Sequence, residues 1–184
     1  MTIENNPRIN IDQEPYVAVR HLIADDIDSL SSIMEQWVRN PETGEVIDEE
    51  IGSIKQLMVD SLLGGNIDRQ YLVAEDASGE PIGVMGMAYP SDDMLTFTST
   101  ERPIEIVNAF VDGDSRGMGV GSQLLDSVFA IAKGLGATEV IVNSGPRYKE
   151  SAWDFYDKKF GGRITILKDK YGPGLDAPVW EKIL

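Results

Sequence analysis

Apolar side chains recur every three or four positions in four stretches of the chain, which is the spacing of helices with one buried face. Acidic residues begin the first two stretches, where they favour the positive end of a helix, and proline or glycine follows each of the four. The spacing of Ser151 and Asp154 predicts a helix cap at the start of the shortest stretch. The pattern predicts helices at 25–40, 48–63, 122–133 and 151–160.

Shorter apolar or alternating runs between turn-forming residues predict strands. Asp76 to Glu80 join two of these runs as a hairpin turn, whereas residues 90–103 are polar, contain prolines and predict a loop. The strands are expected at 16–20, 71–75, 82–89, 104–111, 140–142, 163–168 and 178–183. The element order β-α-α-β-β-β-α-β-α-β-β predicts an α/β (α+β) fold with a mixed sheet and helices on both faces.

The chain of 184 residues suits one domain, because domains commonly contain about 100–200 residues. Residues 1–15 are polar and predict a flexible N-terminal segment before a single domain at 16–184. The sequence has no cysteine, which excludes disulfides, thiolate metal sites and a cysteine nucleophile. A signal peptide and an apolar run of membrane-spanning length are both missing, so we expect a cytoplasmic protein without a membrane partner.

The net charge of −15 is distributed unevenly along the chain. Residues 1–100 carry 19 acidic and 5 basic side chains, whereas residues 101–184 carry 12 acidic and 11 basic ones. No basic surface is expected, so nucleic acid is not expected as a partner. A polyanionic cofactor fits the later part, and a cationic substrate fits the earlier part, although acidic helix faces also occur simply to contact water.

Residues 104–144 combine an apolar run, a glycine-rich loop, a helix and a second apolar run. A helix N-terminus offers free N–H groups and a partial positive charge, and glycines let the backbone approach a ligand closely. Arg116 adds a fixed positive charge whose geometry suits phosphate oxygens. The loop therefore predicts an anion site, although a tight turn without any ligand has the same composition.

Two nucleotide-binding motifs fit this loop poorly. A P-loop needs four residues between its glycines and then a Lys, which the sequence lacks here. A dinucleotide fingerprint needs a third glycine at the position that Leu124 occupies. A dinucleotide-binding α/β protein stays open only as a weaker alternative.

Arg116-x-x-Gly119-x-Gly121 resembles the R/Q-x-x-G-x-G/A signature of the GNAT superfamily of N-acetyltransferases. The strand before it, the helix after it and the later Phe155-Tyr156 pair extend the resemblance over residues 104–162, whereas residues 16–103 resemble the family only in element order. The resemblance implies a mostly antiparallel sheet of about seven strands and acetyl-CoA as cosubstrate, without a metal. It implies cofactor contacts from Phe110, Val111, Asp112, Arg116, Gly117, Met118, Gly119, Val120, Gly121 and Ser122, of which the first three would offer backbone groups.

The resemblance also implies direct transfer of the acetyl group to an amine, without an acyl-enzyme intermediate. Tyr156 is then the candidate general acid for the leaving thiolate, although its ring could simply pack in the core. Glu105 is the candidate general base. Asn108 lies nearer the position of the base in the family but cannot act as one, and a water chain is the other option.

The chain departs from the family pattern before the helix at 151–160, where many members have an Asn and this sequence has Lys149. Lys149 or Ser151 could replace that contact to the cofactor, and Asn143 at the end of its strand could contact the pantetheine arm. Arg147 is a further candidate for the nucleotide end.

The expected acceptor is a primary amine of a small molecule or peptide. The acidic residues of the earlier half favour a cationic acceptor. It would bind between the first two helices and the loop YGPGLDAP at 171–178. A non-catalytic acyl-CoA sensor on the same fold is the alternative function. Exposed sheet edges would also allow a homodimer.

Overall fold

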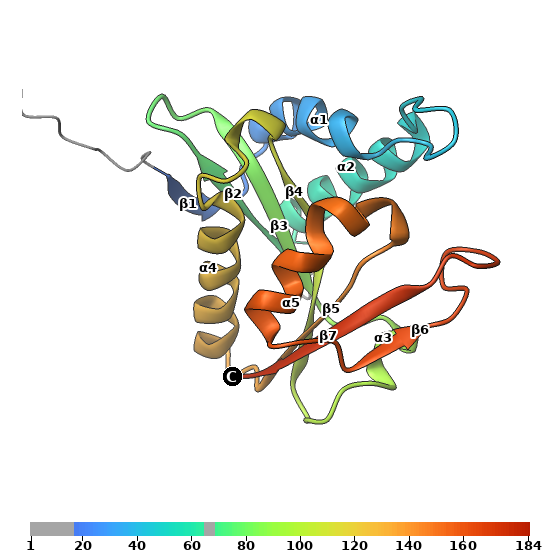
Figure 1. Ribbon diagram of the computed structural model, residues 1–184. Helices are drawn as coiled ribbons and strands as arrows, with labels where there is room; N and C mark the ends of the chain where they lie inside the picture. The colour runs from blue at the N-terminus through green and yellow to red at the C-terminus, as the bar shows by residue number, and fades with distance from the viewer. Residues whose placement is uncertain (1–16, 65–68) are drawn as a thin grey trace, which may run out of the picture.

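The computed structural model describes residues 17–64 and 69–184. The segment expected to be flexible, residues 1–15, therefore lies outside the described residues. One sheet of seven strands runs through the molecule in the order β1-β2-β3-β4-β5-β7-β6 (Figure 1). Its strands are β1 (Ala18–His21), β2 (Arg69–Glu75), β3 (Pro81–Ala88), β4 (Pro103–Val111), β5 (Glu139–Asn143), β6 (Thr165–Leu167) and β7 (Ala177–Ile183).

The sheet is mixed and mostly antiparallel, as predicted. Only β4 and β5 pair in parallel, and the other neighbours are antiparallel. The turn predicted at Asp76 to Glu80 joins β2 to β3, and the N–H of Asp76 donates to the carbonyl of Glu80 at 3.0 Å.

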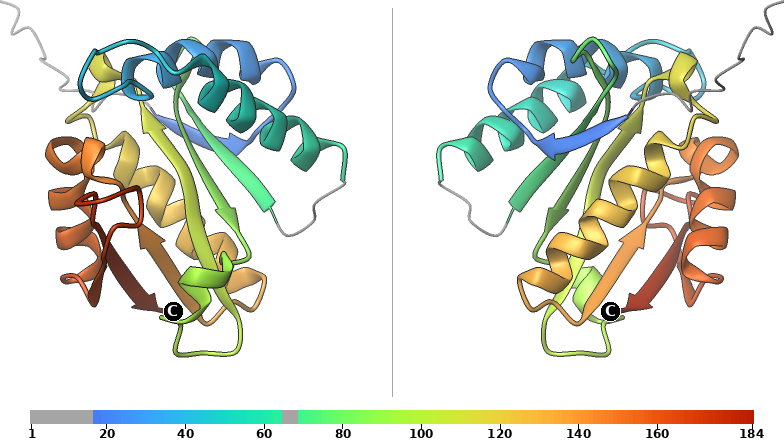
Figure 2. Two further views of the ribbon diagram at one scale, coloured as in Figure 1. Left: turned by 90° about the vertical axis from the view of Figure 1, so that its right-hand side faces the viewer. Right: turned by 90° about the vertical axis from the view of Figure 1, so that its left-hand side faces the viewer.

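Within residues 17–64 and 69–184, five α-helices pack against the sheet (Figure 2): α1 (Asp26–Trp37), α2 (Asp48–Leu62), α3 (Asp92–Leu95), α4 (Val120–Gly134) and α5 (Asp154–Phe160). Helix α3 was predicted as loop, because four residues are too few to show helical periodicity. The helix expected from residue 151 begins instead as a π-helical turn, Lys149–Trp153, that leads directly into α5. Within the described residues, no helix has the length and apolar character that crossing a membrane requires.

Alternating residues of the strands pack on opposite faces of the sheet, and the described residues form three clusters of buried apolar side chains. On β2, Tyr71 and Val73 pack with α1 and α2, whereas Leu72 and Ala74 pack with α4 and α5. The apolar stripe of α4 is buried from Val120 to Ala132, as its spacing predicts. This arrangement fixes the start of α4 close to the end of β4.

Strands β4 and β5 pair only over three residues each, from Pro103 to Glu105 and from Glu139 to Ile141. Beyond this point β5 remains paired with β7 only, and β4 remains paired with β3 only. The register of β4 against β3 also shifts between Val84 and Gly86, where Asn108 takes a φ of 49°. A bulge of this kind bends a strand, and an opening results between the two parallel strands.

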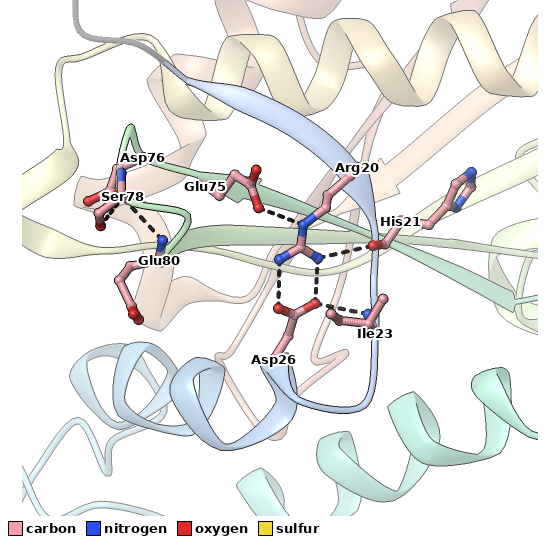
Figure 3. Close-up of polar contacts among 8 residues, drawn as sticks. All are labelled: Arg20, His21, Ile23, Asp26, Glu75, Asp76, Ser78 and Glu80. Carbon is pink, nitrogen blue, oxygen red and sulfur yellow. Dashed lines mark hydrogen bonds and ion pairs between the residues drawn. The ribbon is translucent and has the colours of Figure 1, made fainter.

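A buried ion pair joins the edge strand β1 to the start of α1 (Figure 3). Two nitrogens of the Arg20 guanidinium donate to the two oxygens of Asp26 at 2.7 and 2.8 Å, and its Nε donates to Glu75 at 2.6 Å. The N–H of Ile23 also donates to Asp26 at 2.9 Å. The carboxylate of Asp26 is 4% exposed, and these donors replace the water that it loses on folding.

Candidate active site

A cavity of about 570 Å³ occupies the opening between β4 and β5. Its walls come from α1, α2, β4, the glycine-rich loop, α4, β5, the segment 144–156 and Tyr171. Both predicted catalytic residues, Tyr156 and Glu105, line the cavity. The predicted cofactor residues at the wall are Phe110, Val111, Arg116, Gly117, Gly119, Val120, Gly121, Ser122, Asn143 and Ser151.

The glycine-rich loop brings the N-terminus of α4 to this cavity. Gly117 and Gly119 adopt φ values of 80° and 81°, a left-handed conformation that glycine takes without strain. Gly119 is the residue before the helix, and the first turn of α4 contains no acidic side chain, unlike that of α1 or α2. The first N–H groups of α4 have no acceptor within the helix, so this end of the cavity suits an anion such as a pyrophosphate.

Arg116 lies at the margin of the loop, between α1 and the segment before α5. Its guanidinium stacks 4.7 Å from the centre of the Trp37 ring and donates to the carbonyl of Ser151. The indole N–H of Trp37 in turn donates to the carbonyl of Val111 at 2.8 Å. Trp37 lies in the stretch predicted as a helix at 25–40, and no local pattern in the sequence indicates that it supports Arg116.

Three of the predicted cofactor residues, Asp112, Met118 and Lys149, are not at the cavity wall. The N–H of Asp112 donates to the carbonyl of Ile82 in β3 at 2.9 Å. Hydrogen bonds from Gln36, and then from Ser115, lower the pKa of its carboxyl group. Neighbouring residues of a strand direct their backbone groups to opposite sides, so Val111 offers the backbone edge at the opening and Asp112 does not.

Met118 and Lys149 take other positions. Met118 is 41% exposed, and the Nζ of Lys149 lies 5.9 Å from the centre of the Trp153 ring. Lys149 and Ser151 were the two candidates to replace the Asn that many family members have before this helix. Only Ser151 lies at the cavity wall.

Tyr156 lies on α5 with its ring packed between Phe155, Phe160 and Trp180. The residue is 5% exposed, and this burial raises the pKa of its hydroxyl group above the usual value. The hydroxyl therefore keeps its proton at neutral pH. Tyr156 is among the residues at the cavity wall, and a protonated hydroxyl group can donate to a basic leaving group.

Glu105 is buried at the point where β4 and β5 separate. Its Oε2 accepts from the N–H and the hydroxyl of Ser91 at 2.9 and 3.0 Å, and its Oε1 accepts from Nδ2 of Asn143 at 3.0 Å. These donors suit an ionised carboxylate. Asn143 also accepts from the hydroxyl of Tyr171 at 2.8 Å.

The cavity wall also includes Glu50 and Tyr148, which the sequence did not single out. Arg147, considered above for the nucleotide end, instead donates through Nη2 to both oxygens of Glu50 in α2 at 2.9 Å. The ring of Tyr148 lies 5.2 Å from its guanidinium, and burial raises the pKa of the Tyr148 hydroxyl to about 12. Glu50, Arg147 and Tyr148 line the cavity together with Tyr171.

The family model described as Acetyltransferase (GNAT) family matches residues 31–161. No curated protein matches the sequence. Among solved structures, a GNAT-family protein of Desulfovibrio desulfuricans has 18% identity and a TM-score of 0.73, with 91% of this chain and 99% of that chain covered.

Two further solved structures each have 21% identity and a TM-score of 0.66, and each covers 91% of this chain. One is a ribosomal-protein-alanine N-acetyltransferase of Brucella melitensis, of which 99% is covered. The other is a phosphinothricin acetyltransferase of Sinorhizobium meliloti in complex with acetyl-CoA, of which 88% is covered. At this identity the structures establish the shared fold. Because the family model matches most of the length, the chain belongs to the GNAT family and is an acetyltransferase, as the glycine-rich loop had predicted.

Proposed function

We propose that this protein transfers the acetyl group of acetyl-CoA directly to a primary amine. The observation that carries the proposal is the cavity between β4 and β5, which joins the N-terminus of α4 to a protonated tyrosine and a buried carboxylate. The phosphinothricin acetyltransferase of the same fold is in complex with acetyl-CoA. Acetyl-CoA would supply an activated thioester, and the chain would supply binding and proton transfer.

The residues of the loop fit the anionic end of acetyl-CoA. Gly117, Gly119 and Gly121 have no side chain that would fill the space in front of the free N–H groups of α4, and Arg116 adds positive charge. The N–H of Val111 would pair with the pantetheine arm in the manner of an added strand. Ser122 and Ser151 would add hydroxyl donors.

Proton transfer would fall to the two residues beyond the pyrophosphate site. An attacking amine must be neutral, whereas an alkylammonium group has a pKa of about 10.4, so Glu105 would accept a proton from it. As the new N–C bond forms and the C–S bond breaks, Tyr156 would donate its proton to the departing sulfur. Positioning of the two reactants in one cavity adds to the rate.

Thermal unfolding with different cofactors tests the proposal. Acetyl-CoA at about 100 times its dissociation constant should stabilise the protein by about 2.7 kcal/mol, whereas NAD and ATP should leave the midpoint unchanged. Released thiol should then be measured with kanamycin, phosphinothricin, spermidine and a peptide with an N-terminal alanine. Stabilisation without thiol release from any amine would favour an acyl-CoA sensor, and stabilisation by NAD alone would overturn the proposal.

A further inference from the structure

The last two residues of α1, Gln36 and Trp37, hold the connection from β4 to α4 through three hydrogen bonds. The side-chain amide of Gln36 donates to Oδ1 of Asp112 at 2.9 Å and accepts from the N–H of Gly113 at 2.8 Å. The indole N–H of Trp37 donates to the carbonyl of Val111 at 2.8 Å. We call these two residues the α1 clamp. Its contacts join positions 74 to 77 residues apart in the sequence, so they depend on how α1 packs.

The core of the protein fixes the position of the α1 clamp. Met34 and Val38, on either side of the clamp in the sequence, are fully buried, and the N–H of Val38 donates to the carbonyl of Met34 at 2.8 Å. Gly113 approaches α1 so closely that an added Cβ would lie 3.0 Å from Oε1 of Gln36. Because a close-packed helix has little freedom to shift, the connection that it holds is fixed as well.

Gln36 links α1 to the turn Gly113–Ser115, which directly precedes Arg116. One oxygen of Asp112 accepts from Gln36, and the other accepts from the N–H and the hydroxyl of Ser115 at 3.2 and 3.1 Å. The hydrogen bond from Gln36 is the largest cause of the lowered pKa of the Asp112 carboxyl group. The carboxylate of Asp112 therefore ties the end of α1 to the start of the glycine-rich loop.

Trp37 supports the charge of Arg116 at the cavity wall. The central carbon of the guanidinium lies 4.7 Å from the centre of the Trp37 ring, and the guanidinium donates to the carbonyl of Ser151. Both partners are uncharged, and no carboxylate of the described residues lies within ion-pair distance of Arg116. Stacking uses the face of a guanidinium and leaves N–H groups at its edge. The positive charge is therefore held in one place without being neutralised, which suits an anionic ligand.

We propose that Gln36 and Trp37 are positioning residues for acetyl-CoA, because they hold the β4–α4 connection and Arg116 in the conformation that binds the pyrophosphate. This inference rests on the proposed function and adds to it two residues of α1, far from the glycine-rich loop in the sequence. The α1 clamp acts through the loop and Arg116, and not on the thioester. Its effect should therefore depend on the pyrophosphate of the ligand.

Isothermal titration calorimetry with acetyl-CoA tests the Trp37 half of the α1 clamp. Trp37→Phe keeps an aromatic ring but loses the indole N–H, and the dissociation constant should rise roughly two- to tenfold, the effect of one hydrogen bond. Trp37→Leu loses the stacking as well, and the rise should be roughly ten- to hundredfold. In an Arg116→Ala background no guanidinium remains to be stacked, so Trp37→Leu should there have no larger effect than Trp37→Phe.

Gln36→Glu tests the other half at an exposed position, where the result does not depend on how well the core tolerates a substitution. It replaces the donor to Asp112 with a second negative charge, and the dissociation constant of acetyl-CoA should rise roughly tenfold. Gln56→Glu is the matched control, because Nε2 of Gln56 donates to Oδ1 of Asp60 on α2 at 2.8 Å and neither residue is at the cavity wall. This control should bind acetyl-CoA as the unchanged protein does.

Kinetics with a shortened substrate separates positioning from a general defect of the fold. S-acetylpantetheine carries the same thioester but lacks the pyrophosphate and the nucleotide. With any amine that the enzyme acetylates, Trp37→Leu and Gln36→Glu should lower kcat/KM for acetyl-CoA and leave kcat/KM for S-acetylpantetheine unchanged. An equal fall for the two thioesters, or an unchanged affinity of both variants for acetyl-CoA, would overturn the α1 clamp. Failure of the unchanged protein to bind acetyl-CoA would overturn the proposed function, and the clamp with it.

Discussion

At the scale of single residues, Tyr156 combines a packed ring with a protonated hydroxyl group at the cavity wall. Tyr156→Phe keeps the contacts of the ring with Phe155, Phe160 and Trp180. If the hydroxyl is the general acid, the kcat should fall roughly 10²–10⁴-fold, and the free energy of unfolding should change little. Steady-state kinetics with denaturant unfolding separates the two effects, and near-normal turnover would assign Tyr156 to the core alone.

The same scale shows why the sequence suggested Tyr156 more readily than its partners. An aromatic pair in a short helix is visible in a single stretch of sequence. Tyr171 lies in a Gly/Pro loop and Asn143 at a strand end, positions where polar residues commonly form turns. Their significance depends on the hydrogen bonds between them, which link positions 28 and 38 residues apart.

At the scale of elements, the connection from β4 to α4 depends on backbone conformation more than on side chains. Gly119 has a φ of 81°, and an added Cβ would meet no protein atom within 4 Å. A side chain would therefore extend into the cavity, in front of the first N–H groups of α4. Gly119→Val should abolish detectable acetyl-CoA binding in isothermal titration calorimetry.

Gly79 provides the matched control for this substitution. It has a φ of 86° and equally open space around it, but it lies in the turn between β2 and β3, away from the cavity. Gly79→Val should therefore carry a similar backbone strain, about 1–2 kcal/mol, and retain full affinity for acetyl-CoA. Equal affinities of the two variants would remove the loop from the cofactor site.

At the scale of the whole molecule, an ion pair links the start of the acidic helix α1 to strand β1 of the sheet. Arg20 pairs there with the buried Asp26. Burial by itself raises the pKa of Asp26, but hydrogen bonds from Arg20 and the N–H of Ile23 outweigh it, so the pKa in the folded protein is lower than usual. The unfolded chain, with a pKa of about 3.9 for Asp, therefore binds the proton more readily.

The sign of the pH dependence follows from this lowered pKa. The contribution of Asp26 to stability should be complete above the unfolded pKa and should disappear as the pH falls through the folded pKa. Asp26→Asn should cost about 2–3 kcal/mol at pH 7, at or below the lower limit of the range for a fully buried pair, because Arg20 is 31% exposed. Urea unfolding should show a much smaller difference at pH 2.

Asp28→Asn on the same helix is the control for Asp26→Asn. Its carboxylate pairs with Lys55 at 3.0 Å but is 95% exposed, and pairs of this kind contribute at most about 1 kcal/mol. If Asp28→Asn lowered the free energy of unfolding as much as Asp26→Asn, net charge and not the buried pair would control stability.

Much of the fold could be predicted because its signals are local. Apolar spacing, turn residues and glycines lie within a few positions of one another, and they indicated the order of seven strands and four of the five α-helices. The glycine-rich loop likewise indicated the family, which the family model confirms. Helix α3 was missed because a single turn stabilised by its neighbours has no periodicity to detect.

The sequence by itself therefore determined most of the elements, their order and the position of the glycine-rich loop, since each depends on neighbouring residues. Only the tertiary structure decided which side chains share the cavity. Glu105 and Asn143 meet where β4 separates from β5, close to the bulge at Asn108. The loop between β6 and β7 brings Tyr171 to Asn143. Such contacts depend on strand register and packing, and no local pattern of residues encodes them.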